Sequence, residues 1–162
     1  NISKQSNGIE KTEEEMKIGL ASDHAGYSLK EFVKRYLAEN NMEFVDYGTH
    51  SEESCDYPDF AHALAEGMEC GECEKGIAVC GSGEGISMTL NKHAHIRAAL
   101  VWMPEIGRLA RQHNDANVLV MPGRFIDFDM ARAIMDEFLN TSFEGGRHER
   151  RVAKIPCSCQ RK

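Results

Sequence analysis

The sequence predicts an α/β fold of three layers, in which a five-stranded parallel sheet is covered by helices on both faces. Short apolar segments that are typical of buried strands recur five times, at residues 17–21, 43–46, 76–79, 96–101 and 118–121. Helix-like segments separate these strands along the 162 residues. This alternation is typical of parallel sheets, because each crossover lays a helix on the sheet. The expected architecture is a Rossmann-like sandwich with right-handed crossovers.

The first two predicted strands flank an amphipathic helix. Residues 17–21 read Lys-Ile-Gly-Leu-Ala, and a turn at 22–26 follows them. Over residues 28–40, apolar side chains recur at helical spacing and form one face. The members of this stripe are Leu29, Phe32, Val33, Tyr36 and Leu37. Two asparagines end the helix before the strand at 43–46.

A long loop precedes the third strand. Residues 47–58 predict a loop, and Asp59 is expected to cap a helix over 59–69. The apolar run at 76–79 predicts a buried strand. A glycine-rich segment follows, and a helix is expected over 86–92.

The last two strands continue the alternation. After the strand at 96–101, Pro104 stands in the first turn of a helix predicted over 104–112, where proline is well tolerated. The fifth strand, 118–121, is closed by a Pro-Gly pair. A helix over 127–140 completes the predicted fold.

Composition narrows the function classes. The net charge of −7 argues against nucleic acid as a partner. No apolar run approaches the roughly 20 residues that span a bilayer, so no membrane segment is expected. Residues 1–15 are polar, lack the pattern of a signal peptide and predict a disordered acidic extension. We therefore expect a cytoplasmic protein with one domain at 16–155 and a basic C-terminal tail at 156–162.

The six cysteines do not form a convincing metal or disulfide pattern. Cys70 and Cys73 are two residues apart, but they lie between a helix and a strand. Cys157 and Cys159 lie in the basic tail. Zinc or redox pairing stays an alternative, while free thiols and no metal site are the expected state of a protein without a secretory signal.

The third strand ends on a thiol. Cys80 is followed by Gly81, Gly83 and Gly85, whose backbone N–H groups are free to converge on an anion. The carboxyl ends of parallel strands form the usual ligand-binding edge, and a nearby helix start favours negative charge. The alternatives are a buried structural cysteine and a tight turn. The spacing is not the Gly-x-Gly-x-x-Gly dinucleotide fingerprint.

Further polar groups follow other strands at the same edge. Asp23 and His24 follow the first strand, and Arg124 follows the fifth. Histidine is the usual acid–base group near neutral pH. His113 and Asn114 precede the fifth strand, so they would have to curl back to reach this edge.

A basic cluster near the C-terminus predicts an acid-binding site. Arg147, His148 and Arg151 stand close together in an otherwise acidic chain. Together with Arg124 they suit phosphate, because the planar guanidinium donates two parallel hydrogen bonds. The alternative is a solvated basic tail.

Several blocks together resemble the ribose-5-phosphate isomerase B / galactose-6-phosphate isomerase family. They extend over about residues 16–155 and occur in the family's order. The matching blocks are Gly19-Leu-Ala-Ser-Asp-His-Ala-Gly26, Asp46-Tyr-Gly-Thr49, Asp56-Tyr-Pro58, Cys80-Gly-Ser-Gly-Glu-Gly-Ile-Ser87, Asn91-Lys92, Ile96-Arg-Ala98, Arg111-Gln-His-Asn-Asp-Ala-Asn117 and Glu144-Gly-Gly-Arg-His148.

The resemblance implies an aldose–ketose isomerase that needs neither a metal nor an organic cofactor. It implies that Cys80 moves a proton between C1 and C2, that Ser82 stands where many members have threonine, and that His113 opens the furanose ring. Some members use a loop glutamate as the base; because Cys80 is present, we keep the thiol rather than Glu84 in this role. The glycine loop is then expected to stabilise the enediolate. The loop residues are Gly81, Ser82, Gly83 and Gly85.

The same resemblance implies the binding residues and the assembly. Sugar contacts are expected from Asp23, His24, Tyr57 and Asn114. The phosphate clamp is expected to comprise Arg124, Arg147, His148 and Arg151. In the family the site spans a homodimer interface, so a homodimer or a dimer of dimers with shared sites is expected.

Two other functions stay open. A six-carbon substrate, galactose 6-phosphate or allose 6-phosphate, would use the same chemistry in a roomier pocket. A non-catalytic module that binds sugar phosphates is disfavoured by the presence of both Cys80 and His113.

Overall fold

The central sheet is parallel throughout, as predicted. The structure is a computed structural model and describes residues 16–161. The strands are β1 (Ile18–Ser22), β2 (Phe44–Asp46), β3 (Lys75–Cys80), β4 (Ala98–Leu100) and β5 (Val118–Pro122). They pair in the order β2-β1-β3-β5-β4. The predicted three-layer α/β fold is confirmed.

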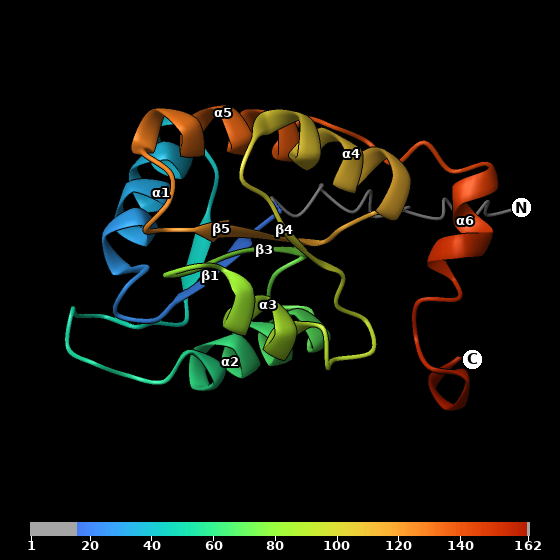
Figure 1. Cartoon of the computed structure of the whole chain (residues 1–162), viewed down its shortest axis with the longest axis horizontal. Helices are drawn as coiled ribbons and strands as arrows, with labels where there is room; N and C mark the ends of the chain where they lie inside the picture. The colour runs from blue at the N-terminus through green and yellow to red at the C-terminus, as the bar shows by residue number, and fades with distance from the viewer. Residues whose placement is uncertain (1–15, 162) are drawn as a thin grey trace, which may run out of the picture.

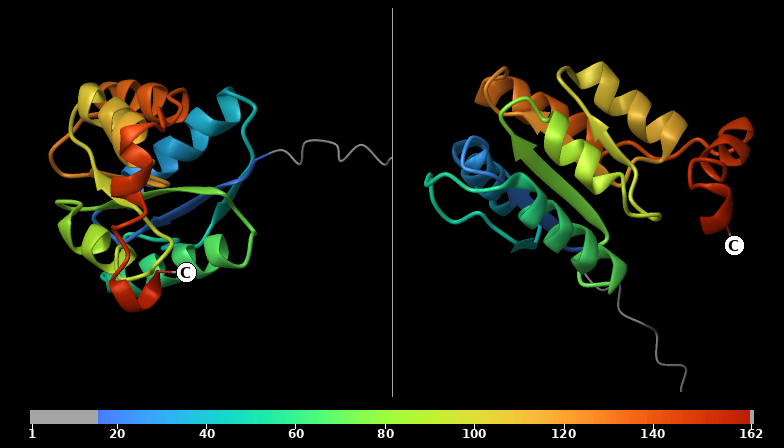
Figure 2. Two further views of the ribbon diagram at one scale, coloured as in Figure 1. Left: turned by 90° about the vertical axis from the view of Figure 1, so that its right-hand side faces the viewer. Right: turned by 60° about the horizontal axis from the view of Figure 1, so that its bottom comes forward.

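Helices cover both faces of this sheet. They are α1 (Tyr27–Glu39), α2 (Tyr57–Glu69), α3 (Glu84–Leu90), α4 (Pro104–Asn114), α5 (Phe128–Leu139) and α6 (Arg147–Val152). Helices α1, α4 and α5 lie on one face, and α2 and α3 lie on the other, as both views in Figure 2 show. Helix α6 stands apart, at the right-hand end of the molecule in Figure 1. None of the helices in the described range is long and apolar enough to cross a membrane.

Two apolar layers hold the sheet between its helices. One joins alternate strand residues, such as Leu20 and Val79, to α1 and α5. The other joins the intervening residues, such as Ala78 and Cys80, to α2 and α3. Both layers exist because successive side chains of a strand point to opposite faces. Cys80 therefore belongs to the layer on the α2 and α3 side.

Two predicted helix starts are wrong by two residues. Helix α2 begins at Tyr57, after Asp56, so Asp59 lies in its first turn and does not cap it. Pro58 fits inside this turn because the first N–H groups of a helix have no partner within the helix. Helix α3 begins at Glu84, directly after Gly83.

The sequence predicts an acidic N-terminal extension and a basic C-terminal tail, and the structure describes only the tail. The acidic extension at residues 1–15 lies outside the described residues. In the C-terminal tail, a short 3₁₀ turn spans Ser158–Gln160, and the guanidinium of Arg161 donates to the carbonyls of Lys154 and Pro156 at 2.9 Å each.

The six cysteines are free thiols. Cys73 is buried and lies 3.7 Å from the hydroxyl of Tyr47, and burial raises the pKa of its thiol. Cys70 is exposed, and its thiol donates to the carbonyl of Gly67. Cys73 is a core residue that packs close to Gly19 of β1.

Candidate active site

Cys80 ends β3 and stands at the carboxyl edge of the sheet. Its side chain is only 4% exposed. The loop after it turns directly into α3 through Gly83, which has a φ of 79°. The hydroxyl of Ser82 accepts the N–H of Glu84 at 3.2 Å. The thiol thus lies at the end of β3, directly before the short loop that leads into α3.

The turn after β1 packs against the last residues of β3. Asp23 is buried, and its carboxylate accepts the N–H of Gly26 at 3.0 Å. A side chain at Gly26 would come within 2.3 Å of the carbonyl oxygen of Val79. Only glycine allows this approach, which brings Asp23 and His24 beside the strand that ends in Cys80.

Arg124 reaches the same edge from β5. The N–H of Gly123 donates to the carbonyl of Cys80 at 2.9 Å, and the N–H of Arg124 donates to the carbonyl of Gly81 at 3.0 Å. These two bonds extend the pairing of β3 with β5 beyond the strands. They fix a guanidinium next to the glycine loop.

Tyr57 closes this group from α2. Its ring lies against Gly85, where a Cβ atom would come within 2.5 Å of the ring. The predicted residues Asp23, His24, Tyr57 and Arg124 therefore gather around residues 80–85, as the sequence indicated. We call this group the Cys80 half-site.

The loop between β2 and α2, residues 47–56, contacts His24. The backbone N–H of Cys55 donates to Nδ1 of His24 at 3.2 Å. The thiol of Cys55 lies 4.0 Å from the same nitrogen. Cys55 carries no sequence signal for this contact, because a backbone donor leaves no signature in the residue type.

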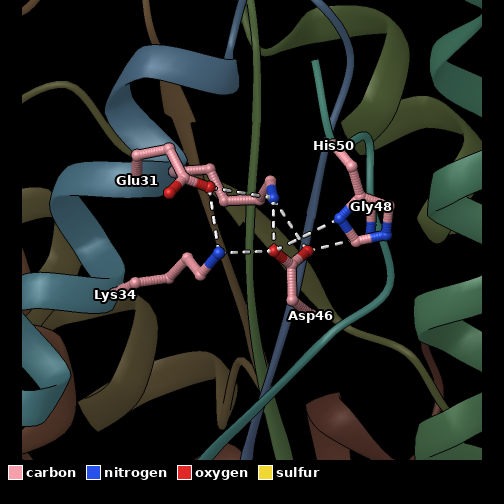
Figure 3. Close-up of polar contacts among 6 residues, drawn as sticks. Glu31, Lys34, Asp46, Gly48 and His50 are labelled. Carbon is pink, nitrogen blue, oxygen red and sulfur yellow. Dashed lines mark hydrogen bonds and ion pairs between the residues drawn. The ribbon is translucent and has the colours of Figure 1, made fainter.

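Asp46 holds the start of this loop. Its carboxylate accepts hydrogen bonds from the ammonium of Lys30 at 2.7 and 2.8 Å and from the N–H of Gly48 at 2.9 Å. Lys34 lies 3.0 Å away, and Figure 3 shows Lys34 and Gly48 on two sides of the carboxylate. Burial alone would raise the pKa of Asp46, but the hydrogen bonds from Lys30, Gly48 and Lys34 outweigh burial and hold this pKa below its ordinary value.

His113 and His148 form a second group, on α4 and α6. Their rings stack with centroids 4.5 Å apart and planes 15° from parallel. Nε2 of His148, which is buried, lies 3.5 Å from the carboxylate of Glu144. Glu144 was given no separate role, although its spacing of four residues from His148 is a detectable signal. Arg147 and Arg151 are exposed on α6, one helical turn apart.

Arg111 fixes the end of α4 that carries this group. Its guanidinium donates to the carboxylate of Asp115 at 2.8 Å and to the carbonyls of Ala116 and Thr141 at 2.6 and 3.1 Å. Asn114, the last residue of α4, lines a pocket of about 430 Å³ together with Asn91, Ile155 and Cys157. We call His113, Asn114, Arg147, His148 and Arg151 the His113 half-site.

The two half-sites lie at opposite edges of the sheet. Helix α4 runs back against the direction of the strands and ends before β5 begins, so His113 stands at the amino edge. Cys80 is paired with Pro122 at the other end of β5, a separation of about 13 Å along that strand alone. Figure 1 shows α6 at the right, away from the carboxyl ends of the strands at the left. His113 and Asn114 do not curl back to the Cys80 edge of the same chain, which is the condition that the sequence set for their reaching it.

A metal ion fits the His113 half-site poorly in this conformation. One ligand atom each from His113, Glu144 and His148 lies within 4.8 Å of the others. An imidazole lone pair lies in the plane of its ring, and two nearly parallel stacked rings cannot both direct a lone pair at one nearby ion.

Comparisons with known proteins agree on one family. A model of the family described as Ribose/Galactose Isomerase matches residues 18–155. The chain is 42% identical over 146 residues to ribose-5-phosphate isomerase B of Escherichia coli strain K12, covering 90% of this chain and 98% of that protein.

Solved structures extend this agreement. A ribose 5-phosphate isomerase from Thermotoga maritima is 51% identical, with a TM-score of 0.85 over 87% of this chain and 97% of that one. Ribose-5-phosphate isomerase B from Mycoplasma genitalium, solved with bound ribulose 5-phosphate, is 40% identical, with a TM-score of 0.82 over 86% and 93% of the two chains. Sequence and fold thus lead to one conclusion: this chain belongs to the ribose/galactose isomerase family.

Proposed function

We propose that this protein interconverts ribose 5-phosphate and ribulose 5-phosphate, in an active site that two copies of the chain build together. The observation that carries the proposal is the Cys80 half-site, where a thiol lies beside the backbone of a glycine loop and a fixed arginine. The relatives named for ribose-5-phosphate isomerase B, one of them solved with ribulose 5-phosphate, support this substrate. Free cysteines are typical of a reducing compartment, so we place the reaction in the cytoplasm.

Cys80 supplies the proton transfer in this proposal. Its thiolate removes the proton from C2 of the open-chain aldose, and the electron pair of that bond forms a C1–C2 double bond while the carbonyl oxygen takes the negative charge. Backbone N–H groups of Gly81, Ser82, Gly83 and Gly85 stabilise this enediolate. The C2 hydroxyl then gives its proton to the oxygen on C1, the thiol returns the carbon-bound proton to C1, and the C2 oxygen becomes the carbonyl of the ketose. The thiolate is the reactive form, and a minor fraction suffices for a base.

The phosphate and the ring are handled by cationic and imidazole groups. His113 exchanges the proton that opens the furanose. Arg147, His148 and Arg151 bind the phosphate from α6, and Arg124 adds a cation from the edge of the glycine loop. Because His113 and Cys80 stand at opposite edges of one chain, the His113 half-site must come from a second copy.

An isomerase assay of the purified protein alone tests the substrate. We expect turnover of ribose 5-phosphate and ribulose 5-phosphate, and lower kcat/KM for allose 6-phosphate and galactose 6-phosphate. Higher kcat/KM with a six-carbon phosphate would reassign the substrate. Binding of all four compounds without turnover would instead indicate a non-catalytic module.

Complementation tests the shared site. Cys80→Ala and His113→Ala damage different half-sites, so each homodimer should be almost inactive. In a 1:1 mixture half of the dimers are mixed, and each mixed dimer holds one undamaged site of two, so about a quarter of wild-type activity is expected. Co-expression with two affinity tags provides the mixed dimer for measurement.

The matched control combines both substitutions in one chain and co-expresses it with an inactive Cys80→Ala chain. No site in that mixture has both halves undamaged, so no activity should return. If the first mixture also stays inactive while mixed dimers form, each site lies within one chain and the shared-site proposal fails.

A further inference from the structure

The loop between β2 and α2 is anchored at both of its ends. At its start, the N–H of Tyr47 donates to the carbonyl of Leu20, and Ser22 exchanges hydrogen bonds with Gly48 and Thr49 at 2.8 Å. Asp46 adds the bond to the N–H of Gly48 and the ion pair with the buried Lys30. At its end, the loop passes directly into α2, which carries Tyr57.

The contact at the far end of the loop defines a protonation state. A backbone N–H can only donate, so Nδ1 of His24 uses its lone pair to accept from Cys55 at 3.2 Å. A neutral imidazole carries its proton on one nitrogen only. The proton of His24 must therefore reside on Nε2.

We propose that the loop at residues 47–56 positions His24 by fixing the tautomer with its proton on Nε2, so that His24 serves the substrate as a hydrogen-bond donor and not as a base. The inference rests on the proposed function only for the identity of the acceptor, a sugar oxygen. Cys55 acts through its main chain in this role, and its thiol is dispensable. Among the groups of the Cys80 half-site, this assigns proton removal to the thiol and hydrogen-bond donation to the imidazole.

The anchoring of the loop explains why this bond is held. The pair formed by Lys30 and Asp46 ties the loop to α1, and α1 begins three residues after His24. The segment that carries the imidazole is therefore also tied to the start of the loop that supplies its donor. Fixing a tautomer through the hydrogen bond of the other ring nitrogen is a general way to orient histidine.

The tautomer can be measured without any substrate. Two-bond ¹⁵N–¹H correlation spectra of the full chain distinguish the two neutral tautomers, and the signal missing from the His24→Asn variant identifies His24. We expect the Nε2–H form in the wild type and in Cys55→Ala, which keeps the backbone donor. A proton on Nδ1, or two tautomers in exchange, in the wild type overturns the inference whatever the enzyme's activity.

Substitutions connect the tautomer to catalysis. Cys55→Pro removes the N–H and should release His24 into both tautomers, with kcat/KM reduced about tenfold, the size expected for one lost neutral hydrogen bond. If Cys55→Pro fails to fold, two variants at position 24 decide the question. The amide nitrogen of Gln lies near the place of Nε2 and that of Asn near the place of Nδ1, so His24→Gln should retain about tenfold more kcat/KM than His24→Asn.

The outcomes separate this inference from the proposed function. If His24→Gln and His24→Asn lose the same kcat/KM while the wild type turns over ribose 5-phosphate, His24 is not a hydrogen-bond donor to the substrate. The assignment as an isomerase would still stand. If the Nε2–H signal is found in a protein without isomerase activity, the inferred tautomer of His24 stands and the proposed substrate is rejected.

Discussion

Replacing Cys80 by alanine is expected to lower kcat for ribose 5-phosphate by about 10³-fold, within the range that a general base contributes. The substitution removes the group that takes the C2 proton in the proposed mechanism, and alanine offers no base in its place. Because Cys80 is 4% exposed and alanine is smaller, the fold should be retained. Stopped assays measure kcat, and isothermal titration calorimetry with ribulose 5-phosphate measures binding separately.

Binding should survive this substitution, since the proposed function places the phosphate on arginines of both half-sites. The matched control is Cys70→Ala, which alters an exposed thiol whose bond is to the carbonyl of Gly67 and should keep wild-type kcat. Exchange of the C2 proton with deuterated solvent gives a second readout. A Cys80→Ala enzyme that exchanges this proton at the wild-type rate would show that another group is the base.

Replacing Asp46 by alanine is expected to lower the free energy of unfolding by about 3–5 kcal/mol, because it leaves a buried charge without its partner. The ammonium of Lys30 is 1% exposed and has Asp46 as its partner at 2.7 Å. Its other acidic neighbour, Glu31, is farther away at 3.7 Å. Urea unfolding followed by circular dichroism measures the loss.

Acid should reduce the difference in unfolding free energy between the wild type and Asp46→Ala. The folded state holds the pKa of Asp46 below its ordinary value, so its carboxylate stabilises the fold fully above the unfolded pKa of about 3.9. This contribution is lost as the pH falls through the lower folded value. The difference in unfolding free energy between wild type and Asp46→Ala should therefore shrink below about pH 4.

Lys34→Ala is the control for Asp46. Lys34 also contacts this carboxylate, at 3.0 Å, but its side chain is 27% exposed, so the loss should stay below about 1 kcal/mol. If Asp46→Ala lowers the free energy of unfolding no more than Lys34→Ala does, the carboxylate does not compensate the buried ammonium of Lys30.

Periodicity was sufficient to predict the sheet and the helices that cover it. Strands such as residues 76–79 are continuous apolar runs, and the stripe from Leu29 to Leu37 has clear helical spacing, so both are properties of neighbouring residues. The start of α2 was misplaced because Pro58 resembles a loop residue although it fits the first turn. Local signals of this kind fix an element's type better than its first residue.

The Cys80 half-site was predictable because parallel strands place their carboxyl ends together. Asp23, Cys80 and Arg124 each follow a different strand, and the topology unites them. The position of His113 was not predictable in the same way, because it depends on the direction in which α4 returns across the sheet. The contact of Cys55 with His24 was hidden for a different reason, since its donor is a main-chain group that every residue except proline carries.

The separation of the two half-sites has a kinetic consequence. Under the proposed shared site, a chain with its thiol at one edge of the sheet and its imidazole cluster at the other has no complete machinery when it is alone in solution. Catalysis would then depend on protein concentration: specific activity would fall on dilution below the dissociation constant for self-association and return when the sample is concentrated. A lower concentration of the chain in a cell would then reduce the activity of each molecule as well as the number of molecules.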